Sequence, residues 1–191
     1  AGTAAAQAQI FTVPVDGGEP KQITTGEGHR FPCWSPDGNW IACIGSEVGA
    51  DKKDVTAIFR VPAEGGEIKK ITTAADKVMW ADLDWSPDGR SIAYFSKEGD
   101  ALAGALNVIP IEGGAPRVIC RVPEVSGRSE LAWSPDGRWI AYVNGGSHVQ
   151  FLGGGSGFIW VVSASGGESR QVTPNYESWS PTWLDARHLL F

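Results

Sequence analysis

The chain has 191 residues, a formal net charge of −6, and 42% hydrophobic and 20% charged residues, the balance of an ordinary globular protein. Because an acidic chain repels phosphate and no run of about 18 apolar residues occurs, we expect neither nucleic-acid binding nor membrane insertion. The 25 glycines and nine tryptophans predict many tight turns and many large, flat side chains between packed sheets.

The first predicted strand covers residues 10–14 and follows a leader or tag-like segment over residues 1–8. Paired glycines at 17–18 predict a hairpin, because glycine adopts positive φ without steric cost. A second short strand over residues 22–24 closes this unit.

Residues 34–38 read Trp-Ser-Pro-Asp-Gly and predict a tight turn between two further strands. Proline fixes φ at the first central position, aspartate hydrogen-bonds back to nearby backbone, and glycine takes the left-handed conformation. The motif returns over residues 85–89 and 133–137, each time followed by a short apolar strand. A fourth copy over residues 183–187 lacks the proline and the glycine, so we expect its turn to have a different shape.

The repeated tryptophans lie 51, 48 and 50 residues apart, and each repeat holds four short segments rich in β-branched and aromatic residues. Four antiparallel strands in a repeat of about 50 residues make one blade of a β-propeller, so we expect an all-β domain over residues 9–191. The expected blade parts are residues 9–28, 29–77, 78–126, 127–177 and 178–191. The expected buried wedges between blades are Trp34, Trp85, Trp133 and Trp183.

These motifs resemble the repeat of TolB-like β-propellers, a relative of the WD repeat, over essentially the whole chain after residue 8. The resemblance implies a bacterial, periplasmic or secreted protein that serves as a non-catalytic protein-binding scaffold or sensor module. Prolyl-oligopeptidase-like and tricorn-like peptidases carry propellers that resemble this repeat and that gate substrates. An alternative function is therefore the substrate-gating propeller of such a peptidase, with the catalytic domain absent. An excised propeller fragment that self-assembles is another. The repeat alone does not choose between them, because one fold hosts many functions.

The strand pattern leaves the number of blades open. The chain is expected to start in the third strand of a blade and to stop in the second strand of another, with three full blades between. One chain closing a four-bladed ring, two chains closing an eight-bladed ring, and a piece of a six- to eight-bladed propeller all fit. TolB-like propellers resemble six-bladed rings more often than four-bladed ones, which favours the piece or the partnered assembly. An apolar edge over residues 189–191 is then a predicted association site for a second copy.

The first strand of each propeller blade lines the central channel, so the residues just before each repeated tryptophan are expected to converge there. They mix aromatic side chains with charges of both signs, a composition that suits a protein ligand. The candidate binding residues are His29, Arg30, Trp80, Asp82, Arg128, Glu130, Tyr176, Glu177 and Trp179. His148 joins them from a long glycine-rich loop over residues 144–157. The two histidines of this set are expected in solvated loops.

The sequence carries no recognisable catalytic motif, and we predict no enzyme activity, cofactor or metal. The three histidines lie far apart, and the three cysteines lack metal-ligand spacing and are an odd number for a disulfide framework. The glycine-rich stretch 153–157 contains a serine, but Phe158 follows it where a nucleophile elbow needs its last glycine. A propeller lyase acting on acidic sugars needs clustered histidines to hold a metal. The histidines of this chain are not clustered, so this class of enzyme is disfavoured.

Overall fold

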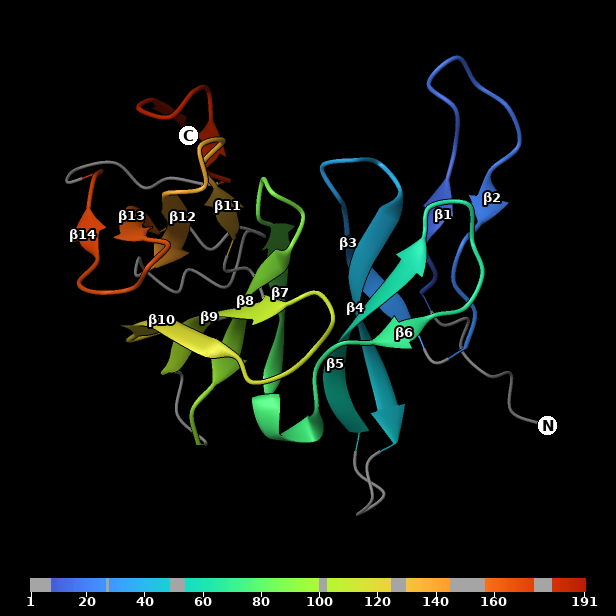
Figure 1. The fold of residues 1–191 in the computed structure, drawn as a ribbon, viewed down its shortest axis with the longest axis horizontal. Helices are drawn as coiled ribbons and strands as arrows, with labels where there is room; N and C mark the ends of the chain where they lie inside the picture. The colour runs from blue at the N-terminus through green and yellow to red at the C-terminus, as the bar shows by residue number, and fades with distance from the viewer. Residues whose placement is uncertain are drawn as a thin grey trace, which may run out of the picture.

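The computed structural model describes residues 8–26, 28–48, 54–99, 103–124, 130–144, 157–173 and 180–191. In these ranges sixteen strands and one short 3-10 helix, η1 (Ala74–Asp76), form three four-stranded and two two-stranded antiparallel sheets (Figure 1). This arrangement confirms the predicted all-β fold of four-stranded blades that starts and ends in the middle of a blade.

Each four-stranded sheet is a meander, because strands adjacent in sequence are adjacent in the sheet. Blade 1 holds β3 (His29–Trp34), β4 (Trp40–Val48), β5 (Asp54–Pro62) and β6 (Lys69–Lys70). Blade 2 holds β7 (Val78–Trp85), β8 (Ser91–Lys97), β9 (Gly104–Pro110) and β10 (Arg117–Val122). Blade 3 holds β11 (Leu131–Trp133), β12 (Trp139–Asn144), β13 (Phe158–Ser163) and β14 (Arg170–Gln171).

Two half-blades flank these sheets. At the N-terminal end, β1 (Phe11–Thr12) and β2 (Lys21–Gln22) occupy the repeat positions of the third and fourth strands of a blade. At the C-terminal end, β15 (Thr182–Trp183) and β16 (Leu189–Leu190) occupy the positions of the first and second strands. Figure 1 shows the two half-blades at opposite ends of the row of blades.

The Trp-Ser-Pro-Asp-Gly turn is held by its own side chains. Asp37 Oδ1 accepts hydrogen bonds from Ser35 Oγ at 2.6 Å and from the Asn39 N–H at 3.1 Å. Ser35 Oγ in turn accepts the Trp40 N–H at 2.9 Å, and Gly38 takes a left-handed φ of 71°. Both remaining full copies repeat this geometry, as the sequence predicted.

The fourth copy reaches a similar result with different residues. Asp185 Oδ1 accepts the N–H groups of Arg187 at 2.7 Å and His188 at 2.9 Å. The hairpin is closed by a hydrogen bond from the Leu184 N–H to the His188 carbonyl oxygen at 2.9 Å. The aspartate therefore caps a turn that has neither the proline nor the glycine.

A buried threonine ties the outer edge of most blades to the third strand. Its hydroxyl oxygen accepts a backbone N–H at 2.8–2.9 Å, which satisfies a donor that burial would otherwise leave unpaired. The pairs are Thr24 with Ile10, Thr72 with Ile58, and Thr173 with Ile159. In blade 2 the position is Cys120, whose Sγ lies 3.8 Å from Tyr142 Oη.

The core lies mainly between blades. One cluster joins blades 1 and 2 around Ile44, Leu83 and Trp85, and another joins blades 2 and 3 around Leu106 and Tyr142. Because each sheet is apolar on the faces that meet its neighbours, the blades stabilise one another.

The four repeated tryptophans are not equally buried. Trp85 is 4% exposed and donates from Nε1 to the Cys33 carbonyl oxygen of blade 1 at 3.2 Å. Trp183 makes the same bond to Ala132 of blade 3 at 3.0 Å, and both Trp183 and Trp133 are partly buried. The prediction that Trp34 is a core wedge is wrong, because its side chain is 53% exposed. In the described chain, its neighbouring half-blade supplies only the third and fourth strands, so no first strand lies against this ring.

Candidate functional site

The structure describes half of the predicted binding residues. His29, Arg30, Trp80, Asp82 and Glu130 lie in described ranges. The rest lie outside the described residues, as does most of the loop over residues 144–157; they are Arg128, His148, Tyr176, Glu177 and Trp179. The described residues of the site therefore come from β3, from β7 and from the residue that precedes β11.

The first strands of the blades lie side by side, with β7 in contact with both β3 and β11. Both β3 and β7 carry a register shift near their starts, between Arg30 and Cys33 and between Val78 and Leu83. Such bulges change the direction in which local side chains point, and they occur often near functional sites.

Each of these irregular stretches contributes one aromatic residue to a pair that bridges blades 1 and 2. The rings of Phe31 and Trp80 have centroids 6.4 Å apart and an interplanar angle of 42°, and both side chains are half-buried. Phe31 has a φ of 54°, which is strained for a non-glycine residue. Ser180 stands at the same repeat position, three residues before its tryptophan, and has a φ of 32°.

Sequence reasoning missed Phe31, although the repeat offered a signal. Asp82 and Glu130, which were predicted, occupy the same position three residues before Trp85 and Trp133. Alignment of the repeats by their tryptophans would have placed Phe31 in the same set.

A half-buried carboxylate, Asp82, lies two residues after Trp80 on β7. Burial, and secondarily the nearby Glu130 and Asp84 carboxylates, raise the pKa of Asp82 to about 6. The backbone N–H groups of Leu83 and Leu131 bond to this carboxylate and moderate the rise. Arg30, one strand away, is exposed. We call Arg30, Phe31, Trp80, Asp82 and Glu130 the channel mouth.

Asp84 has a structural role that the sequence did not reveal. Its Oδ2 accepts the Trp133 N–H of blade 3 at 2.7 Å, and its Oδ1 accepts the Trp85 N–H at 2.9 Å. Burial raises the pKa of this carboxyl above its ordinary value. Asp84 therefore clamps blade 2 to blade 3, and the equivalent residues Cys33 and Ala132 have no carboxylate to do so.

His29 is not in a solvated loop, which corrects the prediction. It lies on β3, is 6% exposed, and packs edge-to-face on Phe59 with centroids 5.4 Å apart. A Cβ at Gly45 would come within 2.9 Å of Phe59 and 3.0 Å of His29, so this glycine makes room for both rings. Burial also lowers the pKa of His29.

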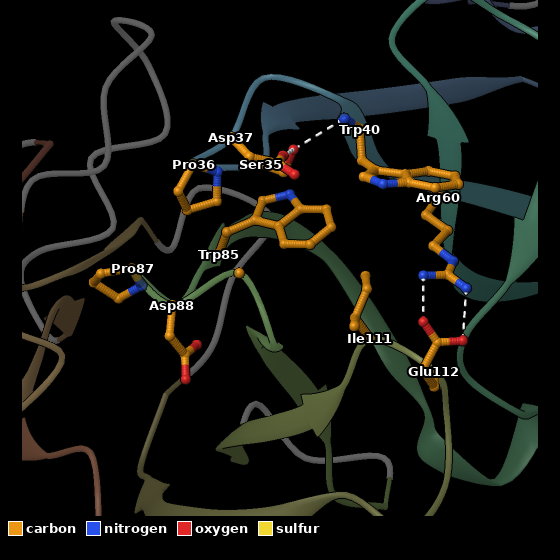
Figure 2. A pocket seen from close by; sticks show the side chains of 11 residues that line it. Ser35, Pro36, Asp37, Trp40, Arg60, Trp85, Pro87, Asp88, Ile111 and Glu112 are labelled. Carbon is orange, nitrogen blue, oxygen red and sulfur yellow. Dashed lines mark hydrogen bonds and ion pairs between the residues drawn. The ribbon is translucent and has the colours of Figure 1, made fainter.

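A groove lies between blades 1 and 2 at the opposite end of β3 and β7 (Figure 2). Its volume is about 420 Å³. Both Nη atoms of Arg60 donate to the Glu112 carboxylate at 2.8 Å, and the guanidinium carbon lies 4.9 Å from the Trp40 ring centroid. The groove was not predicted. Arg60 and Glu112 are 52 positions apart in the sequence, so their contact between neighbouring blades could not be recognised from the sequence.

The described residues include no candidate metal cluster, no membrane-spanning helix and no disulfide. None of their His, Cys, Asp and Glu side chains form a group of three or more that could hold a metal ion. No helix within the described ranges has the length and apolarity needed to cross a membrane. All three cysteines are free, with Cys43 and Cys120 buried.

Stacked four-stranded meanders whose first strands lie side by side define part of a β-propeller, with about four blades' worth of strands. The family model described as "Tricorn protease N-terminal beta propeller domain" matches residues 3–191, and the chain belongs to this family. No curated protein matches it.

Several solved structures share the fold. Putative TolB from Agrobacterium tumefaciens is 23% identical with a TM-score of 0.64, and the match covers 92% of this chain and 58% of that one. The β-propeller domain of the Trilobed protease from Pyrococcus furiosus is 18% identical with a TM-score of 0.54, covering 81% and 45%. The tricorn protease is 16% identical with a TM-score of 0.56, covering 86% and 15%. This chain thus spans less than two thirds of each of these proteins.

Proposed function

We propose that this propeller is a non-catalytic module that binds a polypeptide at the channel mouth. The observation that carries the proposal is the Phe31–Trp80 pair, which places two half-buried rings at a junction between blades. Aromatic side chains at such junctions contribute large contact area at low entropic cost and dominate many binding surfaces.

The charges around this pair favour one kind of partner. The exposed Arg30 precedes Phe31 on β3, Asp82 lies two residues after Trp80 on β7, and Glu130 interacts electrostatically with Asp82. A polypeptide segment that carries an aromatic or aliphatic residue next to a lysine or arginine would complement both features.

The test starts from a random dodecapeptide library displayed on phage and selected on the purified chain. We expect enrichment of basic and apolar residues, and tighter binding of the selected basic peptides to Arg30→Glu, which replaces an exposed cation by an anion. Val118→Ala is the matched surface control, because Val118 is 52% exposed and lies on β10. Selected peptides that bind both variants equally well would overturn the proposal.

A second candidate is a propeller that gates substrates for a peptidase, and the family match favours it. Tricorn and Trilobed proteases are among the similar structures, but their identities below 25% carry the fold alone. The reading frame beyond Phe191 tests this candidate. A hydrolase or protease domain encoded there supports it, and an immediate stop codon contradicts it.

We propose in addition that a second copy of the chain pairs with the half-blades. Val13 is 59% exposed, whereas the residues at its repeat position, Val61, Ile109 and Val162, are fully buried. Leu190 is 54% exposed, whereas Ala42, Ala93 and Ala141 at its position are fully buried. Pairing of β16 from one copy with β1 of another would bury both edges. Light scattering should then give a dimer mass, and a monomer at every concentration would contradict the pairing.

The compartment is a further proposal. We place the protein in the periplasm or outside the cell because its repeats resemble those of TolB-like proteins. Fractionation of the source organism with an antibody to this chain tests the assignment, and recovery in the cytoplasmic fraction would contradict it.

A further inference from the structure

We propose that the groove between blades 1 and 2 is a second binding site, and that it takes the cationic side chain of an arginine or lysine in a polypeptide. The groove lies beyond the C-terminal ends of β3 and β7, whereas the channel mouth lies at their N-terminal ends. The inference does not depend on what the channel mouth binds.

Aromatic, proline and isoleucine side chains form part of the groove lining, together with polar and charged residues. Figure 2 shows the Trp85 ring in the middle, with Pro36 and Pro87 of the two turns on one side and Ile111 and Trp40 on the other. Trp85 is fixed by its hydrogen bond to the carbonyl oxygen of Cys33. The volume of about 420 Å³ lies in the range of ligand pockets, which is roughly 300–1,000 Å³.

The charged residues of the groove are unbalanced. Three carboxylates line it, from Asp37, Asp88 and Glu112, against the single cation Arg60. Hydrogen bonds from the turn serines and from backbone N–H groups hold the pKa values of Asp37 and Asp88 below their ordinary range, so both are ionised at neutral pH. The excess negative charge attracts a cation and repels an anion.

The groove already holds one guanidinium in the way that a ligand would be held. Arg60 lies over the Trp40 ring, and its two Nη atoms meet the two oxygens of Glu112. An aromatic face combined with a carboxylate is a favourable environment for a desolvated cation. Trp85 and Asp88 also line the groove, although only a small part of the Trp85 ring is exposed.

Asp88 differs from the corresponding residue of the next blade. Its Oδ1 accepts Ser86 Oγ at 2.5 Å and the Arg90 N–H at 3.0 Å. In blade 3, Asp136 makes the equivalent bonds, but its Oδ2 also pairs with Arg138 Nε at 2.6 Å. The carboxylate of Asp136 is thus paired within its own turn. Among the described residues, Asp88 forms no such ion pair, although its pKa is lowered by the Ser86 hydrogen bond and, to a smaller extent, electrostatically by the nearby Arg90.

The test uses nuclear magnetic resonance and two small probes of nearly equal shape. Nα-acetyl-arginine amide carries the charge, and Nα-acetyl-citrulline amide lacks it. We expect the arginine probe to shift the indole N–H signals of Trp40 and Trp85 saturably, and the citrulline probe to leave them in place. The Trp80 signal reports the channel mouth and is followed separately, so the responses of Trp40 and Trp85 test the groove whether or not the proposed function holds. The signals are assigned by their disappearance in Trp→Phe variants.

Two variants with the same chemistry complete the design. Asp88→Asn keeps an oxygen acceptor for the turn but removes the charge, and we expect it to weaken the arginine probe about fivefold. Asp136→Asn makes the same change in blade 3 and should leave the dissociation constant unchanged. Equal binding of the two probes, or equal weakening by the two variants, would overturn the proposal. Circular dichroism of both variants establishes that the fold is retained.

Discussion

Replacement of Trp85 by alanine should destabilise the propeller about twice as much as the same change at Trp34. The two residues hold the same repeat position, but Trp85 is 4% exposed and Trp34 is 53% exposed. Truncation of a buried tryptophan costs roughly 3–5 kcal/mol. Because apolar burial contributes ~25 cal/mol per Å² and Trp34 buries about half its surface, its truncation should cost roughly 1.5–2.5 kcal/mol.

Urea unfolding followed by far-ultraviolet circular dichroism measures both losses. The slope of the free energy against urea concentration should stay constant, so that shifts of the midpoint report stability. Repetition at several protein concentrations separates the isolated chain from any assembly. If a second copy covers Trp34, the free energy of unfolding lost in Trp34→Ala should increase with protein concentration. Equal losses for both variants in the dilute, monomeric chain would refute the wedge argument.

Three further changes test the contacts within and between blades. Thr72→Val leaves the buried Ile58 N–H without an acceptor and should cost roughly 1–3 kcal/mol in urea unfolding; a loss within error contradicts this bond's role. Gly113→Ala strains a φ of 87° and places a Cβ 3.2 Å from a carbonyl oxygen of blade 1, so its unfolding midpoint should fall further than that of Gly17→Ala, where the space is open. Burial raises the pKa of Asp82 from 3.8 to about 6, so the folded state binds this proton more tightly and stability should fall as pH rises from about 4 to about 6. Asp82→Asn should flatten that fall when the unfolding midpoint is followed against pH, and an unchanged slope would refute the assignment.

The fold could be predicted from the sequence because the residues that form each turn lie within a few positions of one another. The aspartate of each Trp-Ser-Pro-Asp-Gly motif caps the turn in which it lies, and each paired glycine takes the positive φ that its hairpin needs. Local chemistry of this kind depends only on residues a few positions apart. The strands and their order could therefore be predicted before any contact between blades was known.

The contacts between blades could not be predicted in the same way. Whether Trp34 is buried depends on which strands stand in front of it, and whether His29 is solvated depends on Phe59 and the space left by Gly45. The clamp made by Asp84 and the groove around Arg60 join residues about one repeat apart. Such pairs become visible only once the register of one blade against the next is known.

The dissociation constant of a selected peptide for the Phe31→Ser variant tests the central proposal most directly. Serine occupies the same repeat position at residue 180 with a similarly positive φ, so the substitution removes the ring while keeping a side chain that this backbone accepts elsewhere. If the channel mouth binds polypeptide through the Phe31–Trp80 pair, affinity should fall about tenfold or more, while Val118→Ala binds as the unmodified chain does. An unchanged dissociation constant in a folded Phe31→Ser protein would contradict polypeptide binding at the channel mouth.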